Sequence, residues 1–251
     1  THFFRAGIRV TGSHNTISNN IFRKNRLGIS GVRVTNLTIK NNHFEEDGIS
    51  FTAYENDGRP DIKKNYFIHN IENNTVNGKP LQYYKNEKDR IIKDSEIGQL
   101  ILVNCTNFKI NNISIANTDF GMILAFCNNC ILEQNKIDNN SIAIWLFESN
   151  ENIFQHNKIL DNYDRGIVID YNSNQNLIKR NQIGASFCGV QIEWWSNANS
   201  IIENNLVQNN VSGNEHQSLF SDWNHNYYDD WIGIEKPYLF FYPKIIYGFP
   251  I

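Results

Sequence analysis

Several residue types are scarce in this chain of 251 residues, which contains one methionine, four cysteines and five prolines. No long apolar run occurs, so the sequence predicts no membrane-spanning helix. The formal net charge of −3 argues against nucleic acid as a partner, because binding to phosphates needs a basic patch. The chain begins at Thr1 without a signal-like segment. We therefore interpret it as a mature or trimmed chain from which a targeting signal has been removed.

Asparagine, in contrast, is in large excess and occurs 41 times. Asn favours turns and tolerates the left-handed backbone conformation. Isoleucine, which is also abundant, favours strands. The composition therefore predicts many short strands separated by many turns.

A repeat of about 23 residues organises the chain. Segments with alternating apolar residues open at Gly121, Ala143, Gly166 and Gly189, at intervals of 22, 23 and 23 residues. A copy opens earlier at Gly98, and weaker copies open at Gly7, Gly28 and Gly48. Their period of two indicates strands, because helical repeats need apolar residues at i, i+3, i+4 and i+7. Each repeat is therefore expected to form one coil of a parallel solenoid.

A second column in the repeat is an asparagine followed, two residues later, by an apolar residue. The recurring asparagines are Asn20, Asn42, Asn74, Asn135, Asn157, Asn181 and Asn205. Coils of a parallel solenoid stack about 4.8 Å apart. Each Asn is then expected to hydrogen-bond to the backbone and to the next Asn, forming a ladder inside the turn.

The glycine-led strand copies, the asparagine column and the segment NHNYYDDWIG (residues 224–233) resemble the NosD-type branch of the pectin-lyase-like superfold. This resemblance implies an all-β, right-handed parallel β-helix of about eight coils with 22–24 residues each. It also implies carbohydrate-binding or sugar-hydrolase repeats. The copper loading associated with NosD is not carried over, because the seven histidines lack ligand spacing.

The repeat also predicts the domain organisation. Residues 1–214 are expected to form the β-helix, with insertions near 53–65 and 79–97, and residues 215–251 an aromatic cap of the same domain. No comparable cap precedes the first coil. We therefore expect an upstream segment, a protein partner or self-stacking at the amino-terminal coil.

Alternation along the strands places a set of side chains on one outer face. Asp170 and Glu193 are expected to stack one coil apart, with Glu148 nearby at the strand end. Repulsion between such carboxylates separates their pKa values, as an acid and base pair requires. These three residues are the candidate catalytic groups for a polysaccharide lyase or glycoside hydrolase.

Aromatic side chains surround these carboxylates, and sugar rings stack on aromatic faces. The candidate ligand-binding residues are Trp145, Phe147, Tyr171, Gln191, Trp194 and Trp195. The alternative is an ordinary strand face whose aromatic residues pack under a loop or a partner.

No motif indicates a cofactor or a metal site. Calcium at Asp222, Asp229 and Asp230 is conceivable, but turn and cap hydrogen bonding is the expected use of these residues. Cys105 and Cys127 are one coil apart, so a disulfide between them and a pair of buried free thiols both remain open.

The leading hypothesis is a secreted or cell-surface β-helix that contacts glycans or neighbouring subunits without catalysis. One alternative is a polysaccharide lyase or glycoside hydrolase that uses the stacked carboxylates. The other is a purely architectural module of a larger surface assembly.

Overall fold

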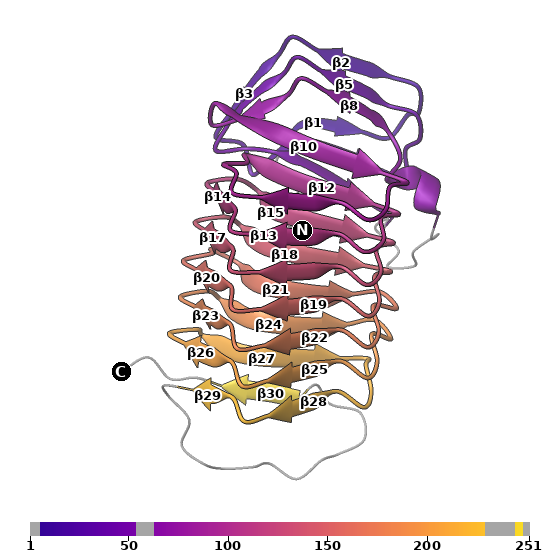
Figure 1. The fold of residues 1–251 in the computed structure, drawn as a ribbon. Helices are drawn as coiled ribbons and strands as arrows, with labels where there is room; N and C mark the ends of the chain where they lie inside the picture. Colours follow the sequence, from indigo (N-terminus) through magenta and orange to yellow (C-terminus); the bar gives the residue numbers. More distant parts are fainter. Residues whose placement is uncertain (1–5, 54–62, 229–243, 248–251) are drawn as a thin grey trace.

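The computed structural model describes residues 6–53, 63–228 and 244–247. They form a right-handed parallel β-helix of about ten turns, and the coils of residues 99–228 are stacked along one axis in Figure 1. The repeat spacing predicted about eight coils. The two additional turns begin at β10 (Lys79–Lys85) and β27 (Val211–His216). Pro80 and Ser212 stand at these openings in place of the Gly or Ala of the other copies, which concealed these turns in the sequence.

Nine short strands form an amino-terminal block of three coils. Its first sheet contains β1 (Ala6–Val10), β4 (Leu27–Val32) and β7 (Ile49–Thr52). Its second contains β2 (Thr16–Ser18), β5 (Thr38–Lys40) and β8 (Asn70–Glu72). The third set is β3 (Ile21–Arg23), β6 (His43–Glu45) and β9 (Thr75–Val76). A short 3₁₀ turn, η1 (Lys64–Tyr66), precedes β8.

The remaining coils form a carboxy-terminal block with three sheets. The first contains β10, β12 (Gln99–Val103), β15 (Phe120–Ala125), β18 (Ile142–Phe147), β21 (Arg165–Asp170), β24 (Cys188–Glu193) and β27. The second contains β11 (Ile91–Lys93), β13 (Lys109–Asn111), β16 (Ile131–Glu133), β19 (Ile153–Gln155), β22 (Leu177–Lys179), β25 (Ser200–Ile202) and β28 (Asp222–Asn224). The third contains β14 (Ser114–Ala116), β17 (Lys136–Asp138), β20 (Lys158–Leu160), β23 (Gln182–Gly184), β26 (Asn205–Val207) and β29 (Tyr227–Tyr228).

A tight hairpin joins the two blocks. β9 and β10 pair antiparallel through Asn77 and Gly78, whose φ angles are 51° and 77°. Such an Asn-Gly pair is typical of a two-residue hairpin turn. The third set of the first block thereby continues into the first sheet of the second block. We predicted an insertion near 79–97, but this segment begins the second block with β10 and β11.

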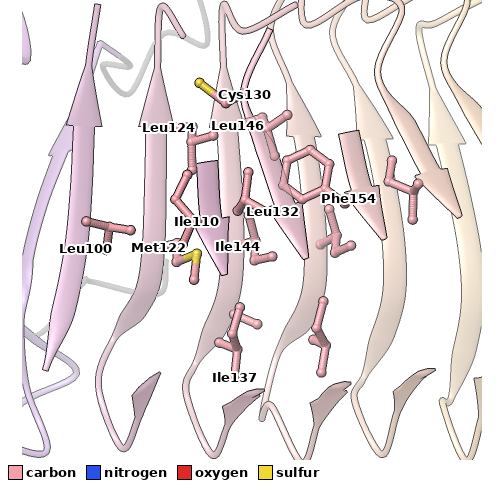
Figure 2. Close-up of a cluster of buried hydrophobic side chains, with 14 of the residues drawn as sticks. Leu100, Ile110, Met122, Leu124, Cys130, Leu132, Ile137, Ile144, Leu146 and Phe154 are labelled. Carbon is pink, nitrogen blue, oxygen red and sulfur yellow. The ribbon is translucent and has the colours of Figure 1, made fainter. Parts of the chain in front are cut away.

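Inward-pointing apolar side chains fill the second block. Figure 2 shows Leu100, Met122 and Ile144 in one column and Ile110, Leu132 and Phe154 in the facing one, all fully buried. In-register parallel pairing, such as Met122 opposite Ile144, places equivalent residues of successive coils on top of one another. Burial of these columns between coils is the main stabilising contribution of the block.

Buried asparagines hydrogen-bond from coil to coil in the turn before the third sheet. Asn157 donates from its backbone and side chain to Asn181 Oδ1 at 2.9 Å, and Asn181 does the same to Asn204 at 2.9 and 3.0 Å. The sequence interpretation placed Asn205 in this column, which is wrong by one position. Leu206, not Val207, points into the core, so Asn204 occupies the buried site.

The solenoid continues beyond residue 214, where we had placed the boundary of the cap. β28 and β29 extend the second and third sheets to Tyr228. β30 (Lys244–Tyr247) pairs antiparallel with β27 and covers its edge. The ring of Trp223 lies where a Cβ on Gly213 would be, so only glycine fits there. Asp229 and Asp230 lie outside the described residues, and Asp222 is exposed on β28.

Buried polar groups hold the two blocks together. Asp119 Oδ2 accepts the backbone N–H groups of Gly28 and Gly48, each at 2.9 Å. Gln99 exchanges two side-chain hydrogen bonds with the backbone of Ile49, at 2.9 and 2.8 Å. Burial raises the pKa of Asp119 to about 7, and the nearby carboxylate of Asp47 acts in the same direction. Protonation near neutral pH therefore bears directly on the contact between the blocks.

Candidate functional site

The outward side chains of the first coils in the second block are covered. Trp145 and Phe147 point outward from β18, yet Phe147 is fully buried and Trp145 nearly so. They share one hydrophobic cluster with Phe51 and Phe67 of the first block. The expectation that Trp145 and Phe147 face solvent is therefore wrong, because the first block packs its aromatic residues against this face.

Two further candidate ligand-binding residues are also buried. Tyr171 stacks on Phe147 with ring centroids 5.6 Å apart and planes inclined by 18°. Gln191 lies buried between the polar side chains of Arg165 and Glu193. Because both side chains are buried, they are not available for contact with a ligand.

Asp170 lies on the outer face, but its carboxyl group is enclosed. It pairs in register with Phe147, and only 5% of its surface is exposed. The indole N–H of Trp145 donates to its Oδ2 at 3.1 Å. The carboxylate is therefore positioned by the aromatic cluster and is closed to a polymeric substrate.

Glu193 follows one coil later, as the register of Ile169 with Ile192 requires. Gln191 donates to Glu193 Oε1, and Arg165 donates both to Gln191 and to Asp164. A chain of side-chain hydrogen bonds thus holds Glu193 in place. Of the predicted acid and base pair, Glu193 lies at the surface, whereas Asp170 is buried.

Glu148, the third candidate catalytic residue, lies in the turn after β18. Burial raises the pKa of its carboxyl group, and a hydrogen bond from Asn172 opposes that shift. The bond joins Asn172 Nδ2 to Glu148 Oε1 at 3.1 Å. Each of the three carboxylates is therefore engaged by a protein donor.

The two neighbouring tryptophans occupy a turn in the left-handed conformation. The φ angles of Trp194 and Trp195 are 48° and 59°, so neither continues the strand β24. Trp194 is half-buried against the hydrophobic cluster, whereas 51% of Trp195 is exposed. Edge-to-face contacts with Tyr171 at 5.6 Å and with Trp194 at 6.2 Å hold the ring of Trp195. Trp195 is therefore a fixed aromatic side chain that faces solvent.

An open groove with a volume of about 750 Å³ crosses the turns of four successive coils, and on the last of them it begins two residues after Trp195. We call it the amide groove, because most of its lining residues are amides. They are Asn128, Asn129, Asn150, Glu151, Asn174, Gln175, Asn197 and Ala198.

Backbone hydrogen bonds fix one column of this groove. Asn150 Oδ1 accepts the backbone N–H of Asn174 at 2.8 Å, and Asn174 Oδ1 accepts that of Asn197 at 2.7 Å. The side-chain nitrogen of Asn197 donates to the carbonyl oxygen of Trp195 at 2.8 Å. The groove and the exposed tryptophan are thus parts of one ordered surface.

Large apolar side chains lie at the carboxy-terminal end of the groove. The backbone of Leu219 bonds to Asn197 Oδ1 and to Ala198 N, which places it on the next coil. Leu219 is 61% exposed and Phe220 is 85% exposed. Together with Trp195 they form an apolar end to a polar groove.

Sequence reasoning missed the amide groove, although a signal was present. The column residues Asn128, Asn150, Asn174 and Asn197 recur at intervals of 22, 24 and 23 residues. Apolar and polar alternation in the sequence identifies strand faces only. The groove lies in the turns between sheets, and the excess of asparagine hid this column among structural ones.

All four cysteines are free and buried. Cys105 and Cys127 lie on adjacent coils, and a hydrogen bond between their thiols lowers the pKa of Cys105. Burial raises the pKa of Cys127, and it raises the pKa of Cys130 to about 11. Cys127 occupies the column of Ser149, whose hydroxyl accepts the backbone N–H of Cys127 at 2.9 Å. Of the two alternatives left open, the structure contains the free thiols.

Comparison with known families identifies two matches. The family model described as "Right handed beta helix region" matches residues 69–211. The model described as "Periplasmic copper-binding protein (NosD)" matches residues 3–98. No curated protein matches the chain.

Several solved structures are similar to this chain at low sequence identity. The structure of a mutant of the periplasmic alginate epimerase AlgG has 14% identity and a TM-score of 0.46, with 79% of this chain and 59% of that chain covered. The GH136 lacto-N-biosidase from Eubacterium ramulus has 11% identity and a TM-score of 0.36, with 89% and 44% covered. The mannuronan C-5 epimerase AlgE6 A-module from Azotobacter vinelandii has 12% identity and a TM-score of 0.36, with 84% and 56% covered. The chain thus spans between two fifths and three fifths of the length of these proteins.

The copper named in one family description does not fit the described residues. No three His, Cys, Asp or Glu side chains converge there on a possible metal position. The single methionine, Met122, is fully buried in the core. Within the same residues, no helix has the length and apolar character needed to cross a bilayer.

Proposed function

The chain belongs to the right-handed β-helix family, and on this premise we propose that it binds carbohydrate without catalysing a reaction. The binding site is the amide groove together with Trp195. One observation carries the proposal: an exposed tryptophan held by aromatic neighbours has its backbone carbonyl bonded to Asn197, which belongs to a column of fixed amides. Sugars present apolar C–H faces and hydroxyl groups, and this surface offers a partner for both.

The state of the carboxylates supports binding over catalysis. Asp170 is buried and accepts a hydrogen bond from the indole N–H of Trp145, and Glu193 is held by Gln191. A general acid or base must reach the proton that it transfers, within about 3 Å. A sugar in the amide groove would not contact the buried carboxylate. A lyase or hydrolase that uses Asp170 and Glu193 is therefore the less favoured hypothesis.

Contact with a neighbouring subunit is a second candidate function, supported by the amino-terminal end. β1, β2 and β3 each pair on one side only among the described strands. Ile21 is 59% exposed there, and a shallow groove of about 460 Å³ runs along Gly7, Ile8 and Ile21. An open strand edge is a template for pairing with another chain. Sedimentation velocity over a range of concentrations tests for such stacking.

We place the protein outside the cytoplasm, in the periplasm or at the cell surface. The support is the family match over residues 3–98, whose description is periplasmic.

A tryptophan substitution tests the proposed site. Trp195→Ala should weaken binding to a glycan identified on an array by at least fivefold, since an aromatic contact contributes about 1 kcal/mol. Calorimetric titration of the full chain measures the change. Tyr163→Ala is the matched control, because Tyr163 is 86% exposed but lies on another turn. Equal binding by the two variants would remove Trp195 from the site, and a wild-type chain that bound no glycan would overturn the proposal.

A further inference from the structure

From the charge and the repeat of the amide groove, we infer that its ligand is an uncharged, extended polysaccharide that lies along the solenoid axis and contacts several coils. This inference rests on the proposed function and specifies the ligand class. It distinguishes neutral chains from the polyuronates, which carry a carboxylate on every sugar.

The lining of the amide groove carries negative charge and no positive charge. Glu151 is the single charged residue among those that line the groove, and no Lys or Arg lines it. Glu148 lies near the groove. It accepts a hydrogen bond from the side chain of Asn172, and the backbone carbonyl of Asn172 accepts one from the groove residue Asn174. Glu193 directly precedes the tryptophan pair. A polyuronate in the groove would place its carboxylates near Glu151 with no cation among the lining residues to balance them, and like charges repel over such distances.

The amide side chains of the groove are held in a fixed orientation. The Oδ1 atoms of Asn128, Asn150 and Asn174 are each occupied by a backbone N–H of the next coil. Their orientation is thereby fixed before a ligand arrives, so binding costs little side-chain entropy. Amide groups both donate and accept hydrogen bonds, as hydroxyl groups do. A surface of this kind matches hydroxyl-rich sugars and offers no ion pair to an acidic one.

The spacing of the coils suits an extended sugar chain. Equivalent residues of successive coils are about 4.8 Å apart, and the groove presents the same amide type on four coils. A pyranose ring in an extended chain advances by a comparable distance, so successive sugars meet equivalent amides. Trp195, Leu219 and Phe220 add an apolar end on which ring faces can rest. A ligand longer than a disaccharide is needed to use the whole surface.

Matched oligosaccharides test this inference on the full chain. Calorimetric titration compares hexamers of β-1,4-linked glucose, mannose and xylose with hexamers of β-1,4-linked glucuronate and mannuronate, at low ionic strength. At least one neutral hexamer should bind tenfold more tightly than either uronate hexamer and tenfold more tightly than its own dimer. Glu151→Lys should narrow the gap between neutral and acidic hexamers at least threefold. Glu72→Lys, an exposed site on β8 with the same charge change, should leave the gap unchanged.

The outcomes distinguish carbohydrate binding itself from the preference for uncharged chains. If no hexamer of either kind binds, the proposed function fails. If carbohydrate binds but the uronate hexamers bind as tightly as the neutral ones, the function stands and the inferred ligand class is overturned. If the dimer binds as tightly as the hexamer, the contact with several coils is refuted.

Discussion

At the scale of single residues, buried asparagines determine where each turn begins. Asn204 donates its side-chain N–H groups to the carbonyl oxygens of Ile178 and Ile202 at 2.8 and 3.0 Å. It also accepts two hydrogen bonds from Asn181. Since a buried polar group that loses its partner costs about 1–3 kcal/mol, one such residue affects several neighbouring turns.

Neighbouring asparagines provide a comparison within one turn. Asn204→Ala should lower the free energy of unfolding by about 3 kcal/mol, because several buried backbone groups lose their partner. Asn205→Ala should change it by less than about 0.5 kcal/mol, since Asn205 is exposed at the start of β26. Urea denaturation measures both. A larger loss for Asn205 than for Asn204 would contradict the observed register.

The residue scale also shows the limit of the sequence pattern. Strand alternation correctly places Ile144 and Leu146 inside and Trp145 and Phe147 outside. It does not tell what lies against the outer face, because that contact joins residues far apart in the sequence, such as Phe67 and Trp145. The aromatic residues selected as a sugar platform are therefore largely a second core. Only the exposed Trp195 retains the expected character.

At the scale of elements, the junction between the blocks explains both successes and failures of prediction. The glycine-led strands and the asparagine columns follow a local period, so their coils were predictable. The turn of the chain at β9 and β10 depends on Asn77 and Gly78, a local hairpin signal within a region interpreted as an insertion. The buried contact of Asp119 with Gly28 and Gly48 spans 91 and 71 residues and has no counterpart in the repeat.

Asp119 should make this junction sensitive to pH. Its pKa is raised from 3.8 to about 7 by burial, so the folded state binds a proton that the unfolded state has released between these values. The corresponding stability is complete below pH 3.8 and is lost as the pH rises through 7. The free energy of unfolding of the wild type should therefore fall by about 4 kcal/mol relative to Asp119→Asn between pH 4 and pH 8.

Paired urea denaturation at several pH values measures this difference. Comparison with Asp119→Asn removes contributions common to both proteins, including that of His69, whose pKa burial lowers to about 4. The two groups change the stability of the fold in opposite directions. His69 destabilises the fold as the pH falls below 6.5, whereas Asp119 destabilises it as the pH rises. Parallel stability curves for the two proteins would exclude Asp119 as a pH-dependent contact.

At the scale of the whole molecule, the solenoid is a rigid support whose faces differ. One outer face is closed by the first block through Phe51 and Phe67. The turns beyond it form the amide groove with Trp195 at its side. Loops and turns on a regular support commonly carry function, and here the repeat aligns identical amides on successive coils. Binding along the axis is the activity that this arrangement favours.

A crystal structure of the full chain with a bound neutral hexasaccharide tests this account most directly. The account predicts sugar rings along the amide groove, with one ring against Trp195 and hydroxyl groups within hydrogen-bond distance of Asn150 and Asn174. A hexasaccharide bound instead against Glu193 on the outer face of β21 and β24, with the groove and Trp195 untouched, would contradict it.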